Sequence, residues 1–125
     1  MSESNKAKYL TVALYVFGII FVVGIYASMQ LMPASWTWEP RQPEYEQMIM
    51  GLYAVLGIFM IRAARDPARH LSLLWFVIWS SLVHGLIMLV QALRDPAETP
   101  NFYGDIPALL IVAVVLWLLM PKKAA

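Results

Sequence analysis

Residues 71–93 read LSLLWFVIWSSLVHGLIMLVQAL and contain no aspartate, glutamate, lysine or arginine. A helix needs about 20 mostly apolar residues to cross a hydrocarbon core of about 30 Å, and this stretch meets that requirement. Arg94-Asp95-Pro96 follows directly and ends the helix, because the residue before a proline disfavours helical geometry. The stretch therefore predicts one membrane span and places the chain among integral membrane proteins.

The composition of the whole chain leads to the same class. Of its 125 residues, 61% are apolar and 14% are charged, whereas soluble domains average about 45–50% and about 25%. A net charge of +1 excludes a nucleic-acid partner, because such proteins must neutralise many phosphates. The absence of cysteine excludes disulfides, thiolate metal sites and cysteine nucleophiles.

Three further apolar segments accompany the first one. They cover residues 9–32, which Pro33 stops, residues 45–65, which Pro43 precedes, and residues 106–120, which Pro121 stops. The last segment is short, and Asp105 stands where it could cap the helix. Short connections force neighbouring helices to run antiparallel. We therefore expect an all-α fold, a four-transmembrane-helix antiparallel bundle, formed by residues 1–125 as one domain.

Basic residues are divided unequally between the two sides of this predicted bundle. Arg41 and Arg94 lie on one side, and the other seven lie on the side of both termini. Those seven are Lys6, Lys8, Arg62, Arg65, Arg69, Lys122 and Lys123. Because basic loops stay on the cytoplasmic side, we expect both termini to be cytoplasmic.

Polar residues inside the second and third spans follow a regular spacing. In antiparallel helices, residues at equal depth have residue numbers with a constant sum. The pairs with the same sum are Glu46 with Gln91, Tyr53 with His84, and Gly57 with Ser80. Within each helix the steps are seven and four residues, which puts the set on one helical face. We expect these two faces to pack together, with Gly57 opposite Ser80 allowing a close approach.

This ladder has two interpretations. Polar groups inside a membrane are costly and are candidates for a functional site, so the ladder could form a ligand-binding pocket in the outer half of the bundle. Its candidate ligand-binding residues are Glu46, Tyr53, His84, Gln91 and Ser80. Alternatively, the same residues bond to each other and hold the helices in register. We expect no catalytic residues and no metal site, since His-x-x-x-His and similar ligand pairs are absent, and no cofactor can be named.

Parts of the second and third spans resemble a known type of protein. The relevant segments are EQMIMGLYAVLG at 46–57, RDP at 65–67, FVIWSSLVHG at 76–85 and MLVQ at 88–91. They resemble small uncharacterised bacterial four-helix membrane proteins, broadly of the DoxX-like type, through a Glu-x(6)-Tyr-x(3)-Gly pattern. The resemblance implies a four-helix fold, a location in a bacterial inner membrane and no particular reaction.

Two functions remain open at this point. The first is a non-catalytic accessory or structural subunit that lies in the bilayer and packs against a larger membrane complex or another copy of itself. It follows from the lack of a catalytic arrangement. The alternative is a binding protein for a lipophilic small molecule, a quinone or a lipid, at the polar ladder. An enzyme acting on a membrane-soluble substrate is the least favoured interpretation.

Overall fold

The structure is a computed structural model that describes residues 1–122, and within these residues every regular element is a helix. Lys123, which the charge argument used, lies outside the described residues. The elements are α1 (Glu3–Ile19), the π-helical turn η1 (Ile20–Gly24), α2 (Ile25–Leu31), α3 (Pro33–Trp36), α4 (Pro43–Ala63), the 3₁₀ turn η2 (Pro67–Arg69), α5 (Leu71–Arg94), the 3₁₀ segment η3 (Pro96–Tyr103) and α6 (Asp105–Leu119).

Three helical stretches are long and apolar enough to cross a membrane: Glu3–Leu31, Pro43–Ala63 and Leu71–Arg94. A fourth is obtained if η3 and α6, which meet at 45°, count as one bent span. The expected class, an all-helical protein with several apolar helices, is confirmed. The first helix starts earlier than expected, because the Ser2 Oγ accepts a hydrogen bond from the Asn5 N–H at 3.2 Å and caps a polar first turn.

The composition of two connections, residues 33–44 and 97–103, predicts loops, but both contain helical turns. Pro33 begins α3, where its missing N–H costs nothing because the first turn of a helix leaves its N–H groups unpaired. In η3 the Asp95 carboxylate accepts the Ala97 N–H at 3.0 Å. Proline therefore does not keep residues 33–36 free of helix, and α4 begins at Pro43, within the same stretch.

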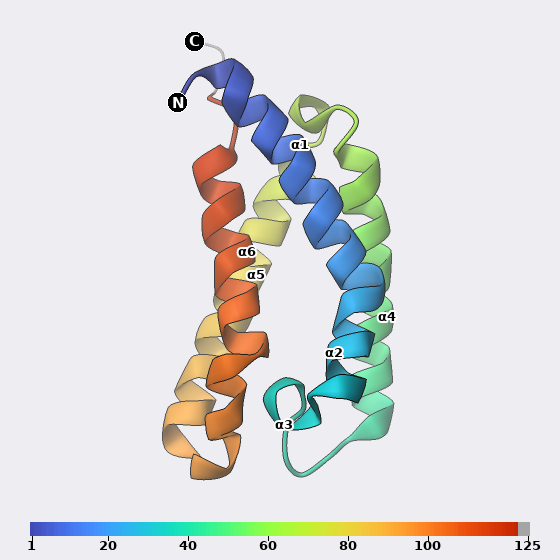
Figure 1. The fold of residues 1–125 in the computed structure, drawn as a ribbon, viewed down its shortest axis with the longest axis vertical. Helices are drawn as coiled ribbons and strands as arrows, with labels where there is room; N and C mark the ends of the chain where they lie inside the picture. The colour runs from blue at the N-terminus through green and yellow to red at the C-terminus, as the bar shows by residue number, and fades with distance from the viewer. Residues whose placement is uncertain (123–125) are drawn as a thin grey trace.

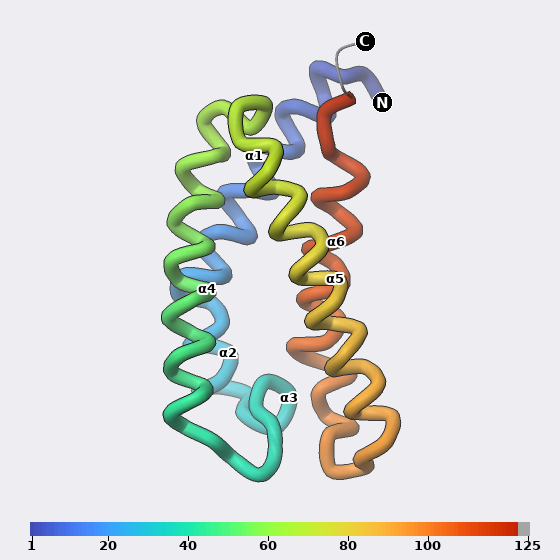
Figure 2. The backbone as a smooth tube through the Cα atoms, turned by 180° about the vertical axis from the view of Figure 1, so that it is seen from behind, coloured from blue at the N-terminus to red at the C-terminus, as the bar shows by residue number. Residues whose placement is uncertain are grey.

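The long helices form two pairs (Figure 1). The stretch α1–α2 packs with α4, and α5 packs with α6. Both termini lie at the same end of the molecule, where the Lys122 ammonium is 3.9 Å from the Glu3 carboxylate. Figure 2 shows α3 between the two pairs at the opposite end.

The core is continuous only in the half that carries the termini. There Leu10 of α1, Met60 of α4, Leu74 of α5 and Leu116 of α6 are each at most 1% exposed and belong to one cluster. In the other half, a smaller cluster around Met88 joins mainly α5 and α6. The two pairs are thus packed together at one end and separate toward the other.

Gly18 and Gly57 determine where α4 lies. A Cβ atom added to Gly57 would come within 2.5 Å of the Gly18 carbonyl oxygen, and one added to Gly18 within 2.9 Å of the Gly57 carbonyl oxygen. The backbones of α1 and α4 therefore touch directly, as small residues permit in membrane helices. The expected contact between Gly57 and Ser80 was wrong, because Gly57 faces α1 and the Ser80 hydroxyl donates to the Val77 carbonyl within α5 at 3.3 Å.

This contact makes a prediction about stability. Gly57→Ala forces α1 and α4 apart, and we expect it to lower the free energy of unfolding by about 1–3 kcal/mol, the usual cost of overpacking. Gly51→Ala is the matched control, since a Cβ there meets no atom within 4 Å, and it should be neutral or stabilising by up to about 1 kcal/mol. Thermal unfolding in detergent measures both, and equal melting temperatures would refute the role of the contact.

Candidate functional site

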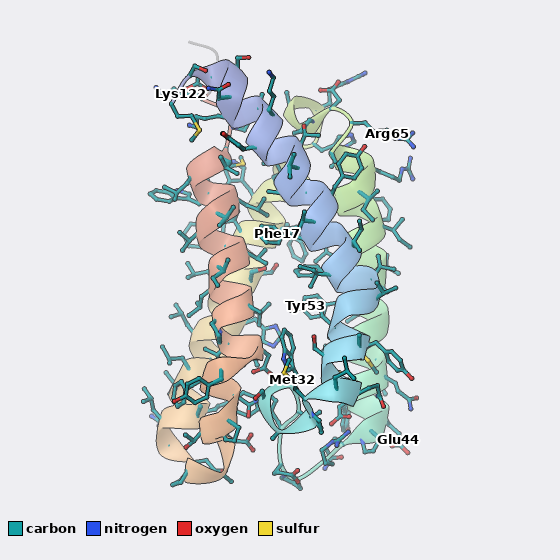
Figure 3. The ribbon with its side chains drawn as sticks, in the orientation of Figure 1. Phe17, Met32, Glu44, Tyr53, Arg65 and Lys122 are labelled. Atoms are coloured by element: carbon teal, nitrogen blue, oxygen red, sulfur yellow. The ribbon has the colours of Figure 1, made fainter. Side chains whose placement is uncertain are left out.

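A cavity of about 740 Å³ lies between the two helix pairs, in the half where they separate. Every long helix contributes to its wall, and Figure 3 shows Tyr53 in this space. The aromatic and sulfur-containing residues of the wall are Phe17, Phe21, Met29, Trp36, Trp38, Tyr45, Met50, Tyr53 and Met88. Its polar residues are Thr37, Gln42, Glu46, His84, Gln91 and Asp105.

Four of the five residues expected at a ligand site line this cavity: Glu46, Tyr53, His84 and Gln91. Ser80, the fifth, does not line it and is bonded to its own helix. Two of the predicted pairs, Glu46 with Gln91 and Tyr53 with His84, therefore surround one cavity. The third pair, Gly57 with Ser80, lies outside it.

Tyr53 and His84 form the rung that the sequence predicts. The Tyr53 hydroxyl lies 2.6 Å from the His84 Nδ1, which joins α4 to α5 across the cavity. On its other side the Tyr53 ring meets Phe21 edge to face, with 5.0 Å between ring centres. This geometry fixes the tyrosine ring from two sides and holds the histidine ring in the wall.

Glu46 has a different partner from the one expected. Its two carboxylate oxygens accept hydrogen bonds from the Arg41 Nε at 2.7 Å and Nη2 at 2.8 Å. A bidentate guanidinium pair is stronger than a bond from an amide such as Gln91, so the expected rung between Glu46 and Gln91 was wrong. The bond also raises the pKa of the Arg41 guanidinium above its usual value. The short spacing between Arg41 and Glu46 is the signal that could have revealed this pair.

A second polar cluster lies at the end of the molecule opposite the termini, near α3, and was missed by the sequence argument. We call it the outer cluster for this position in the molecule. It centres on Asp105, whose Oδ2 accepts the Trp38 indole N–H at 2.7 Å. The Asn101 Nδ2 donates to the Asp105 Oδ1 at 3.1 Å and to the Thr37 carbonyl at 3.0 Å. Asp105 was expected to cap α6 but is instead its first residue, and its carboxylate serves these long-range contacts.

The outer cluster fixes the segment 33–42 across the end of the cavity. The Glu39 N–H donates to the Glu98 Oε1 at 2.7 Å, and Glu98 is only 3% exposed. Gly104 lies so close to Ser35 that an added Cβ would collide with the Ser35 carbonyl oxygen. Because Trp36 and Trp38 line the cavity, this segment forms part of the cavity wall at the end of the molecule opposite the termini.

The wall as a whole has the character of a small-molecule site. Such sites have volumes of about 300–1,000 Å³, a mainly apolar wall and a few polar groups that orient the ligand. The cavity falls in this range, and its two carboxylates are already bonded to donors of the protein. Binding of an apolar molecule with a small polar head is the chemistry that this arrangement suits.

Comparison with known proteins places the chain in one family. The model of a family of unknown function, DUF6632, matches residues 4–124, so the chain belongs to this family. No curated protein matches it significantly, and neither does any solved structure.

The outer cluster predicts how the segment 33–42 is held. Trp38→Phe removes the indole N–H and leaves the Asp105 carboxylate with one donor fewer, which should cost about 1–3 kcal/mol of stability. Hydrogen–deuterium exchange should become faster in residues 33–42. The control Trp117→Phe changes an exposed tryptophan of α6 and should leave exchange in that segment unchanged. Equal exchange in both variants would contradict the role of Trp38.

Proposed function

We propose that this member of DUF6632 binds a lipophilic small molecule, a quinone or a lipid, in the cavity between its helix pairs. The observation that carries the proposal is the cavity itself, about 740 Å³ with a mainly apolar wall and the Tyr53–His84 pair across it. If the polar residues served only to hold the helices in register, side chains would fill this space, since protein interiors are close-packed.

Apolar side chains at the edge of the cavity support access from the membrane. Ile20 of η1 and Ile111 of α6 both line the cavity and are 38% and 54% exposed. These residues leave an apolar route toward the lipid side of the helices. A molecule dissolved in the bilayer can reach the Tyr53–His84 pair along this route without crossing water.

We further propose four spans, with η3 and α6 acting together as the fourth, in a bacterial inner membrane. Figure 3 shows Arg65 and Lys122 at the end that carries the termini and Glu44 at the opposite end. The positive-inside rule then supports a cytoplasmic location for both termini. The cavity would lie in the outer half of the bilayer.

The accessory-subunit role remains a separate prediction, as does the resemblance to DoxX-like proteins. Exposed apolar side chains occur on every long helix of residues 1–122. Lipid alone requires such a surface, so it does not single out one face for a partner. The cavity therefore favours ligand binding over the accessory role.

Native mass spectrometry of the protein extracted from its own membrane tests the proposed function. We expect a small-molecule adduct on the wild-type chain and its loss in Ala108→Phe, because Ala108 lines the cavity and a phenyl ring there would obstruct the ligand. Ala27→Phe, at an exposed position of α2, should keep the adduct. A wild-type protein that carries no adduct but another polypeptide in fixed ratio would favour the accessory role instead.

Cysteine labelling tests the proposed orientation, and the lack of native cysteines removes any background. Ala97→Cys in η3 should react with a membrane-impermeant maleimide in intact spheroplasts, since it would lie outside. Ala68→Cys in η2 should react only after the membrane is permeabilised. The reverse pattern would overturn the orientation.

A further inference from the structure

We infer that the ligand is an aminophospholipid, with an acyl chain in the cavity and with its phosphate and primary ammonium group in a charged hollow beside the cavity. The charged hollow has a volume of about 430 Å³, and its lining residues are Trp38, Glu39, Gln91, Arg94, Asp95 and Glu98. The inference rests on the proposed function and names the class of lipid that the same site would take.

The charged hollow adjoins the cavity. Trp38 and Gln91 line both spaces, and Gln91 is exposed, so it lies on the rim between them. His84, Gln91 and Arg94 follow one another along α5 at steps of seven and three residues, which puts them on one side of the helix. The helix rises about 15 Å from His84 to Arg94. A ligand can therefore extend from the Tyr53–His84 pair past Gln91 to Arg94.

The cavity itself offers hydrogen bonds but no free charge. Its two carboxylates are bonded to donors of the protein. The side-chain groups of its wall that are accessible and that no described residue bonds are the Gln42 and Gln91 amides, the Tyr45 hydroxyl and the His84 Nε2. Amides and hydroxyls both donate and accept, so they suit the ester and glycerol region of a lipid without specifying its head.

The charged hollow is what specifies the head. Within residues 1–122 Arg94 makes no salt bridge, and the fork of donors on a guanidinium matches phosphate oxygens. Three carboxylates, those of Glu39, Asp95 and Glu98, line the same hollow. A head with a phosphate alone would meet an excess of negative charge. A head that carries an ammonium group next to its phosphate matches both signs.

Glu98 favours a primary ammonium group in particular. The residue is only 3% exposed, and its Oε1 accepts the Glu39 N–H at 2.7 Å. Its Oε2 has no partner among the described residues, and unlike the Trp36 Nε1 it is not fully enclosed. A carboxylate oxygen without a donor in so buried a side chain costs free energy. A primary ammonium supplies three N–H donors, whereas a trimethylammonium supplies none.

The position of the charged hollow suits a membrane lipid. It is formed by α5, η3 and the segment 33–42, at the end of the molecule opposite the termini. The proposed orientation puts this end at the outer surface, where phospholipid heads lie, and the cavity deeper, where their chains lie. The exposed side of the cavity at Ile20 and Ile111 leaves the second acyl chain a route into the bilayer.

The test is native mass spectrometry of the full chain in detergent with an equimolar mixture of four lipids that have the same acyl chains. They are phosphatidylethanolamine, phosphatidylcholine, phosphatidylglycerol and diacylglycerol. We expect the phosphatidylethanolamine adduct to be the most abundant on the wild type. Glu98→Gln keeps an oxygen that can accept the Glu39 N–H and removes the charge. It should lower the ratio of bound phosphatidylethanolamine to bound phosphatidylcholine about five- to tenfold, the effect of one hydrogen bond to a charged group.

Arg94→Gln should give a different pattern, because it removes the partner of the phosphate. All three phospholipids should decrease relative to diacylglycerol, which has no phosphate. Glu44→Gln is the matched control, since Glu44 lies at the same end (Figure 3) and lines neither the cavity nor the charged hollow. It should leave every ratio unchanged. Binding of diacylglycerol by each variant shows that its cavity is intact.

Equal binding of phosphatidylethanolamine and phosphatidylcholine, with no effect of Glu98→Gln, would overturn the inference while the proposed function stands, because a lipid still binds. A preference for phosphatidylglycerol or for diacylglycerol would overturn it in the same way. If the wild type binds none of the four lipids and no decyl-1,4-benzoquinone either, the proposed function fails as well.

Discussion

The direct contact between the backbones of α1 and α4 at Gly18 and Gly57 controls the rest of the structure. It packs α4 against the first helix, so α4 does not pack along the length of α5. The helices then form two pairs that share a core near the termini and separate beyond it. The cavity is the geometric result of this separation, and a side chain at either glycine would change its shape.

The far end of the cavity depends on polar bonds as well as on packing. Asp105, Asn101 and Glu98 are buried and hold the segment 33–42 by its tryptophan and its backbone. Buried polar groups of this kind specify one arrangement because each unmade bond is costly. The outer cluster thus holds in place the segment that contributes Trp36 and Trp38 to the cavity wall.

Hydropathy was sufficient to locate the long apolar helices: the expected span at 71–93 differs from α5 by one residue. It did not predict the polar start of α1 or the short helix α3. The Tyr53–His84 rung was also predictable, because equal depth in antiparallel helices brings these residues together. The partner of Gly57 was not, since a small residue permits a close approach to any neighbour without choosing one. The bond from Trp38 to Asp105 joins residues 67 apart, and no periodicity of the chain relates them.

Ile20 and Ile111 give the cavity an exposed apolar side, and this has a thermodynamic consequence. Under the proposed function, a ligand that arrives through that side leaves lipid rather than water, so its tail gains little from the transfer because lipid chains are as apolar as the wall. Occupancy is then governed by the mole fraction of the ligand among the lipids, not by its aqueous concentration. Discrimination between two molecules with similar tails falls to the few polar atoms of the wall.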